Sequence, residues 1–397
     1  MSVSRKIVIV LGCVIASLAL GLIVVFSARR RAEEPFDSYR KALIDRRSSA
    51  AAGKANALAI NSTEDLDFVH FSSSTLGWVG NHYGLLYATE DAGKTWIRRD
   101  IKSPVGLGNT YYPDMNFGLD TGWAIAQQKS KPGEDICQRV GSLLRTNDRG
   151  QTWYVLLTKN CTELLRIAVA GKNEVWILGH QFVQTKERVE GRFLILHTSD
   201  GGNRWDDVSE LPNRLMMDSN RRVLESPASI VTTGEGSAMV ITHNGYLLDA
   251  TSGGRQWRRS GSIALHSVLP EAREMSDRSV TISAGVDGSH GTAGMVARRE
   301  LNGNWTGSWF TDLYTRDALF LSDHEIVACG SLLPEERELL LNGEREGVIL
   351  YSTDSGSNWT IIYRARDRKA VTALSLSPDG VINAVGSKGL LVEVKRP

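Results

Sequence analysis

Short apolar segments alternate with polar turns along most of the chain, and this alternation repeats from about residue 61 onward. Seven apolar segments, several of which end in glycine, occupy residues 77–80, 122–125, 175–179, 238–241, 280–283, 326–330 and 381–386. Another apolar segment precedes each of them, as at 66–71 and 371–376. Four strands in about 48 residues form one propeller blade. The pattern therefore predicts an all-β, seven-bladed β-propeller of four-stranded blades over residues 61–397.

An octapeptide of the form S/T-x-D-x-G-x-T-W follows the third strand of several units. It is complete at 89–96 and 146–153, lacks only the second threonine at 198–205 and 352–359, and is degenerate at 250–257 and 298–305. Hydroxyl and carboxylate groups satisfy backbone N–H groups in turns, glycine allows a positive φ, and tryptophan buries apolar surface between sheets. Four carboxylates on four blades cannot converge on one ion. We therefore predict structural roles, with neither metal nor cofactor, for Thr89, Asp91, Gly93, Trp96, Thr146, Asp148, Gly150, Trp153, Thr198, Asp200, Gly202, Trp205, Gly254, Trp257, Ser352, Asp354, Gly356 and Trp359.

The seventh unit has no octapeptide and ends at Pro397 after three predicted strands. A circular propeller avoids an open sheet edge when the other terminus supplies the missing strand. We expect residues 57–60 to close the seventh blade in this way. The rest of 27–60 is charged and then small and polar, which indicates a linker. A short helix over 35–47 is an alternative for its first part.

The N-terminus contains 20 residues, 7–26, without a charge or a proline. As a helix this segment would span about 30 Å, the thickness of a bilayer core. A cleaved signal peptide has a shorter apolar core of about 7–15 residues. We therefore predict a short tail at 1–6 and an uncleaved transmembrane anchor at 7–26. Basic residues flank this segment on both sides and do not decide its topology.

Two of the four cysteines bear on the compartment. Cys137 precedes the third strand of the second unit, Cys161 follows its fourth strand, and both are equally far from Arg149 in the intervening turn. Such residues face each other across an antiparallel hairpin, which is compatible with a disulfide and with an oxidising compartment. This favours a single-pass inner (plasma) membrane protein with a periplasmic or extracytoplasmic propeller. The alternative is a cytoplasmic domain with two free thiols. Cys329, in an apolar strand, is expected to be buried and free.

Charge and motif content exclude several function classes. The protein has 46 Lys and Arg against 45 Asp and Glu, whereas nucleic-acid binders carry a basic excess. It contains no H-E-x-x-H, C-x-x-C, G-x-S-x-G or P-loop motif, and its eight histidines are scattered. We therefore expect a protein that is not an enzyme.

The G-W-x-x-G strand followed by T-x-D-x-G-x-T-W resembles the photosystem II stability/assembly factor family over residues 61–397, and more loosely other Asp-box (BNR-repeat) propellers, including sialidases. The first resemblance, to a family with many relatives in non-photosynthetic bacteria, implies a lumenal or periplasmic propeller that supports membrane-protein assembly without catalysis. The second would require an arginine cluster, a Tyr–Glu pair and an acidic residue. The Arg-Ile-Pro segment of sialidases is absent, and Tyr314, Arg316 and Asp317 stand alone, so glycosidase activity is disfavoured.

Loops of variable length lie on the propeller face opposite the octapeptide turns, and loops on a rigid scaffold are common binding sites. Their arginines, tyrosines and mixed charges favour a protein partner, although solvated variable loops are the alternative. The predicted partner-binding residues are Tyr111, Tyr112, Arg188, Arg214, Arg221, Arg222, Glu335 and Arg337. We predict a membrane-anchored, extracytoplasmic, non-enzymatic scaffold or assembly factor for an envelope complex. The alternative is an envelope carbohydrate-binding or glycosidase-like propeller.

Overall fold

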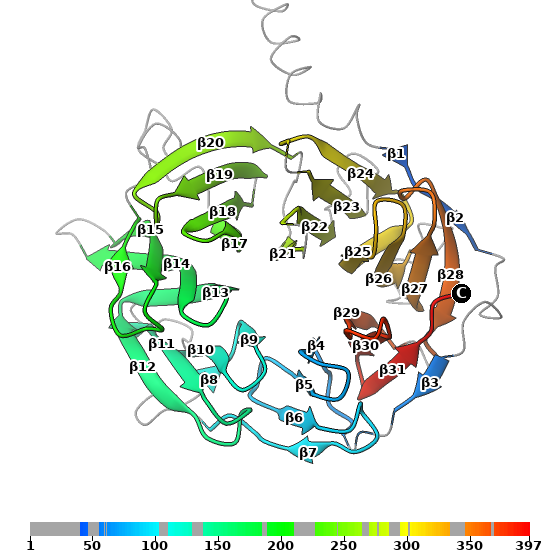
Figure 1. Cartoon of the computed structure of the whole chain (residues 1–397), viewed down its shortest axis with the longest axis horizontal. Coiled ribbons are helices and arrows are strands. Elements are labelled where there is room, and N and C mark those ends of the chain that lie inside the picture. Colours follow the sequence, from blue (N-terminus) through cyan, green and yellow to red (C-terminus); the bar gives the residue numbers. More distant parts are fainter. Residues whose placement is uncertain are drawn as a thin grey trace, which may run out of the picture.

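The computed structural model describes residues 40–46, 55–58, 60, 62–102, 110–128, 138–184, 189–209, 227–243, 245–263, 270–275, 278–285, 294–300, 302–333, 346–366 and 369–397. In this part of the protein the strands form seven sheets arranged in a ring (Figure 1). Each sheet contains at least four strands, which confirms the predicted all-β, seven-bladed propeller.

The blades are numbered in sequence order, and their strands are given from the inside of the ring outward. Blade 1 contains β4 (Phe68–Phe71), β5 (Gly77–Gly80), β6 (Leu86–Thr89) and β7 (Ile97–Arg98). Blade 2 contains β8 (Thr110–Tyr111) with β9 (Met115–Phe117), then β10 (Gly122–Gln128), β11 (Val140–Thr146) and β12 (Tyr154–Asn160). Blade 3 contains β13 (Thr162–Ala170), β14 (Glu174–Gln184), β15 (Val189–Thr198) and β16 (Asp206–Asp207). Blade 4 contains β17 (Pro227–Gly234), β18 (Ser237–Thr242), β19 (Tyr246–Thr251) and β20 (Gln256–Ser262). Blade 5 contains β21 (Glu271–Glu274), β22 (Val280–Gly285), β23 (Gly294–Arg299) and β24 (Trp305–Phe310). Blade 6 contains β25 (Leu313–Phe320), β26 (Ile326–Leu332), β27 (Glu346–Ser352) and β28 (Asn358–Arg364). Blade 7 contains β29 (Val371–Leu376), β30 (Ile382–Gly386), β31 (Leu390–Val394) and β3 (Ala55–Ala57).

Apolar packing between blades holds the ring together. Second strands such as β5 are buried along their whole length because both sheet faces pack against neighbours. In the described residues, seven buried apolar clusters each join two adjacent blades. One of them brings Val385 and Leu391 of blade 7 against Val79 and Tyr87 of blade 1, so the ring closes through its core.

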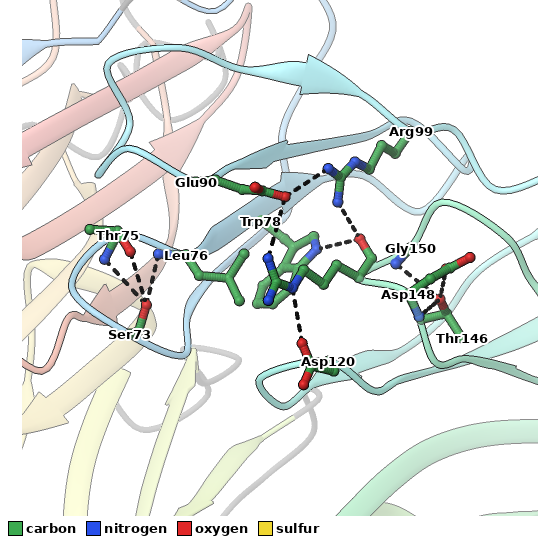
Figure 2. Close-up of polar contacts among 11 residues, drawn as sticks. Ser73, Thr75, Leu76, Trp78, Glu90, Arg99, Asp120, Thr146, Asp148 and Gly150 are labelled. Carbon is green, nitrogen blue, oxygen red and sulfur yellow. Dashed lines mark hydrogen bonds and ion pairs between the residues drawn. The ribbon is translucent and has the colours of Figure 1, made fainter.

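The octapeptide turns join the third and fourth strands on one face of the ring, called the box face; the opposite face is called the loop face. In the blade 2 turn, the Thr146 hydroxyl donates to Asp148 (2.7 Å) and accepts the Gly150 N–H (2.9 Å) (Figure 2). Asp148 accepts the N–H and the hydroxyl of Thr152 at 2.8 and 2.6 Å. Gly150 has a φ of +85°, which glycine adopts without strain. The same hydroxyl–carboxylate–glycine arrangement recurs at 89–93, 198–202 and 352–356.

The blade 2 turn also fastens blade 1 to blade 2. The backbone carbonyl of Arg149 accepts the Trp78 indole N–H (3.1 Å) and an Arg99 N–H (2.8 Å) (Figure 2). The Arg149 guanidinium lies 3.0 Å from Asp120 and 3.7 Å from Glu90. The local geometry of the turn thus serves an inter-blade contact.

The segment before the repeats is a strap across the outside of blades 5 to 7 (Figure 1). β1 (Arg40–Lys41) pairs in parallel with β24, and β2 (Leu43–Asp45) pairs in parallel with β28. Ala42 between them is only 3% exposed. The expectation of a linker or a short helix is therefore wrong for 40–46: the outer strands offer unpaired backbone groups, and extended backbone satisfies them.

The fourth strand of blade 7 comes from the N-terminal segment. β3 pairs antiparallel with β31, and the Leu58 N–H donates to the Leu391 carbonyl at 3.0 Å. The strand thus begins two residues before the expected 57–60. The Leu58 side chain packs beside Trp96 and Gly93 of the blade 1 octapeptide turn. Leu156 of blade 2 contacts Gly202 of blade 3 in the same way, so the junction between blades 7 and 1 repeats the contact used elsewhere in the ring.

The predicted anchor at 7–26 and the tail at 1–6 lie outside the described residues, and within these residues no helix is long and apolar enough to cross a membrane. Cys137 also lies outside them. A bulge at Leu143 and Leu144 shifts the blade 2 hairpin so that Val140 faces Asn160, which leaves the Cys137–Cys161 disulfide a prediction. Cys329 is buried and unpaired, and burial raises the pKa of its thiol.

Candidate functional site

The inner strands of all seven blades line a central cavity of about 990 Å³, called the channel. Its lining includes carboxylates, arginines and tyrosines from different blades, which the ring brings together although they are far apart in sequence. A cavity that gathers polar and aromatic side chains from every blade is the candidate site in the described part of the protein.

Two aspartates in the channel, Asp114, which is half-buried, and Asp317, which is buried, tie neighbouring blades together. Asp114, which precedes β9, accepts the Ile167 N–H of blade 3 at 2.7 Å. Asp317 of blade 6, 2% exposed, accepts the Leu374 N–H of blade 7 at 2.8 Å and pairs with Arg273 of blade 5. Both carboxylates therefore bind backbone donors of the adjacent inner strand.

Burial dominates the electrostatics of these aspartates. Desolvation raises the pKa of Asp114 to about 6 against the opposing charge of Arg166. It likewise raises the pKa of Asp317 to about 6 against Arg273. Burial, followed by the charge of Arg273, lowers the pKa of His70 to about 4, so this imidazole is neutral near pH 7.

A second ion pair crosses the channel between blades 3 and 5. Arg166 lies 3.5 Å from Glu271. Glu274, further along the same blade 5 strand, accepts the Thr232 hydroxyl of blade 4. These channel charges bind each other or neighbouring blades, and the described residues contain no group of three His, Cys, Asp or Glu side chains that could hold a metal ion.

β-Bulges occur at matching places on the inner strands of four blades. Near the start of β13, β17, β25 and β29 a register shift leaves out one residue, and these residues are Leu165, Ala228, Arg316 and Thr372. A second shift in β17 leaves out Thr233. A bulge re-aims the side chain of the extra residue. Arg316 is the charged member of this set; it is exposed and lines the channel, with its guanidinium 5.2 Å from the centre of the Tyr314 ring.

Two of the eight predicted partner-binding residues are described. Tyr111 is half-buried, lines the channel and donates to Glu163 at 3.5 Å. Tyr112 is 2% exposed in a core cluster, and its hydroxyl donates to the Ile101 carbonyl at 3.2 Å. Tyr112 is therefore a core residue and cannot contact a partner. The other six lie outside the described residues: Arg188, Arg214, Arg221, Arg222, Glu335 and Arg337.

Comparison with known proteins agrees with this architecture. A family model described as Photosynthesis system II assembly factor YCF48 matches residues 139–290. The solved structure "YCF48 bound to D1 peptide" is 17% identical with a TM-score of 0.56, and the match covers 89% of this chain and 98% of that chain. YCF48 from Cyanidioschyzon merolae is also 17% identical with a TM-score of 0.55, and that match covers 85% and 98% of the two chains.

The chain is a β-propeller that is similar to YCF48 in fold and, over residues 139–290, matches its family model. No curated protein matches it. The fold itself is shared with enzymes, because the GH74 xyloglucanase from Xanthomonas campestris is 13% identical with a TM-score of 0.59. That match covers 87% of this chain and 53% of the xyloglucanase. Fold likeness alone therefore does not separate a binding protein from an enzyme.

Several charged residues of the channel were missed by sequence reasoning, although Tyr111, Tyr314, Arg316 and Asp317 were named there. Asp114, Arg166 and Arg273 lie in or beside the first strand of their units, where charged residues interrupt an otherwise apolar segment. That interruption is the signal that could have identified them, because a charge in an inner strand must face the channel or a partner.

Proposed function

We propose that this protein is a non-catalytic, protein-binding scaffold or assembly factor for a membrane or envelope complex, with its propeller anchored on the extracytoplasmic side. One observation carries the non-catalytic part: the channel carboxylates Asp114 and Asp317 accept backbone N–H groups of adjacent blades. A general acid or base must instead reach a substrate proton. One of the structurally similar YCF48 proteins is bound to a D1 peptide, which supports a protein ligand.

The strap adds a geometric expectation to this proposal. Parallel pairing with β24 and β28 makes 40–45 run from the box face toward the loop face. At one end, Arg40 donates to Ser357 (3.0 Å) in the octapeptide turn of blade 6. At the other end, Arg46 contacts Asp312 (3.3 Å), which precedes the first strand of that blade. The roughly 13 residues between the predicted anchor and Arg40 reach at most about 45 Å. The predicted anchor would thus hold the propeller to the membrane at the box-face edge of blades 5 and 6, which leaves the loop face free to bind a partner.

The test is mass spectrometry of proteins that co-purify from mildly solubilised membranes. Because β26 ends at Leu332 and β27 begins at Glu346, residues 334–345 can be replaced by a short glycine–serine turn without removing a strand. A matched control shortens 286–293, the corresponding loop of blade 5. We expect a stoichiometric membrane partner that is lost with the first variant and retained with the second. If the intact protein retains no partner, the scaffold proposal is wrong.

The alternative is a carbohydrate-active propeller, for which the presence of Tyr314 and Glu271 in the channel and the xyloglucanase-like fold are the supporting observations. Aromatic and carboxylate side chains are typical of glycosidase sites. A reducing-sugar assay with xyloglucan and with sialyllactose decides between the two. We expect no release of sugar, and turnover that is abolished by Glu271→Gln would establish the alternative.

A further inference from the structure

Arg316 is a channel arginine whose charge the fold does not use. Arg166 and Arg273 each pair with a carboxylate of another blade. In contrast, Arg316 forms no ion pair among the described residues, and it is exposed on a bulge between Thr315 and Asp317. An exposed guanidinium that has no carboxylate partner in the fold is available to bind an anionic ligand.

The Arg316 side chain has a fixed support. Its guanidinium lies over the Tyr314 ring at 5.2 Å from the ring centre, a stabilising cation–π geometry. A second constraint on that ring is Gly285 of blade 5, where an added Cβ would lie 2.5 Å from the ring. Tyr314 therefore fills the space that a side chain at 285 would need, and this packing restricts the position of Arg316.

We propose that Arg316 binds a carboxylate of a peptide that enters the channel from the loop face, a specification that rests on the proposed protein-binding function. A guanidinium donates two parallel N–H groups to a carboxylate, which makes the pair both strong and geometrically specific. The carboxylate comes from an acidic side chain of the peptide or from its C-terminus.

The channel lining favours a peptide over an acidic glycan. Asp67, at the loop-face end of blade 1, has no side-chain hydrogen bond or ion pair among the described residues, although it lines the same cavity. A peptide carries N–H groups or cationic side chains that such a carboxylate accepts. An acidic glycan has no cationic group that could pair with Asp67, whereas a peptide can supply one.

The test uses the full-length protein in nanodiscs and three fluorescein-labelled nonapeptides of alanine, serine and glycine. One has a central aspartate and an amidated C-terminus, one has a free C-terminal carboxylate and no aspartate, and one has neither. Fluorescence anisotropy is measured with wild type, R316A, R316K and the control R258A, whose arginine is 73% exposed on an outer strand. Near-UV circular dichroism checks that each variant is folded.

We expect at least one carboxylate peptide to bind wild type and R258A at least tenfold more tightly than R316A. R316K should be intermediate because it retains the charge and loses the planar fork. Comparison of the first two peptides assigns the carboxylate to a side chain or a C-terminus. Equal binding of all three peptides, or equal affinity of R316A and wild type, overturns the proposal. Tighter Arg316-dependent binding of oligogalacturonate than of any peptide overturns the peptide assignment.

Co-purification with R316A separates this inference from the proposed function. If wild type and R316A retain the same membrane partner equally, the carboxylate site is wrong and the scaffold function stands. If wild type retains no partner but binds a carboxylate peptide through Arg316, the scaffold function is wrong and the carboxylate site stands.

Discussion

Closure of the ring by β3 can be tested at Leu58. Its N–H donates to the Leu391 carbonyl, and its half-buried side chain packs against Trp96. Leu58→Ala removes three carbons, worth about 0.8 kcal/mol each if fully buried, so we expect a loss of about 1–2 kcal/mol. Leu58→Pro also removes the N–H and leaves the Leu391 carbonyl unpaired, which costs about 2 kcal/mol more. The expected total is about 3–4 kcal/mol.

The assay is urea unfolding followed by tryptophan fluorescence, with thermal unfolding as a second measurement. For a protein of this length 1 kcal/mol corresponds to roughly 2 °C, so the melting temperature should fall by about 2–4 °C for L58A and about 6–8 °C for L58P. The matched control is Leu43→Ala, since Leu43 lies in β2 of the same segment and is 59% exposed; we expect a change below about 0.5 kcal/mol. If L58P is no less stable than L58A, the Leu58–Leu391 hydrogen bond does not close the ring.

Three further predictions concern pH, the octapeptide turns and the cysteines. Because the folded pKa values of Asp114 and Asp317 are raised to about 6, the folded state binds more protons than the unfolded state between about pH 4 and 6. Stability should therefore fall as pH rises through that window, by up to about 3 kcal/mol per group, and Asp317→Asn should flatten the fall measured by urea unfolding. A stability profile that rises steadily from pH 4 to 6 would contradict the raised pKa values of Asp114 and Asp317. In the octapeptide turns, hydrogen bonds lower the pKa of Asp91 to about 2, and they outweigh burial to lower the pKa of Asp148 to about 2 as well. The contribution of Asp91 and Asp148 to stability is therefore present above about pH 4 and is lost toward pH 2. Gly150→Ala should destabilise the folded state by about 2 kcal/mol or more, because φ is +85° and the new Cβ would lie 3.1 Å from Leu86. The control Gly171→Ala, with a φ of +66° and no neighbour within 4 Å of the new Cβ, should cost about 1 kcal/mol. Maleimide labelling and mass spectrometry should show that Cys137 and Cys161 react only after reduction, and labelling of both without reductant would refute the disulfide.

The seven blades could be predicted because each octapeptide turn is local: one hydroxyl, one carboxylate and one glycine within five residues satisfy the same backbone groups wherever they recur. β1 and β2 could not be predicted in this way. Residues 40–45 have mixed charge and short apolar stretches, and their extended form depends on the free edges of β24 and β28, which are distant in sequence. Tyr112 was misassigned for a similar reason, because its burial against Ile101 depends on how two blades meet.

The contacts in the channel were beyond sequence reasoning because they join residues of different blades that are far apart in the sequence. Arg273 and Asp317 come from blades 5 and 6, and the Leu374 N–H that shares Asp317 comes from blade 7. The bulge that exposes Arg316 is a one-residue shift of register, and no spacing in the sequence marks it. The ring geometry is therefore needed to bring these groups together.

The distribution of charge in the channel separates stability from binding. Substitution of Asp114, Asp317 or Arg273 leaves a buried donor or acceptor without its partner, so such changes should weaken the ring itself. In the described residues, the Arg316 side chain forms no ion pair with another blade. A protein that tolerates R316A with unchanged stability but loses its ligand would thus show that the inner strands supply two distinct sets of charges, one that joins blades and one that is available to a partner.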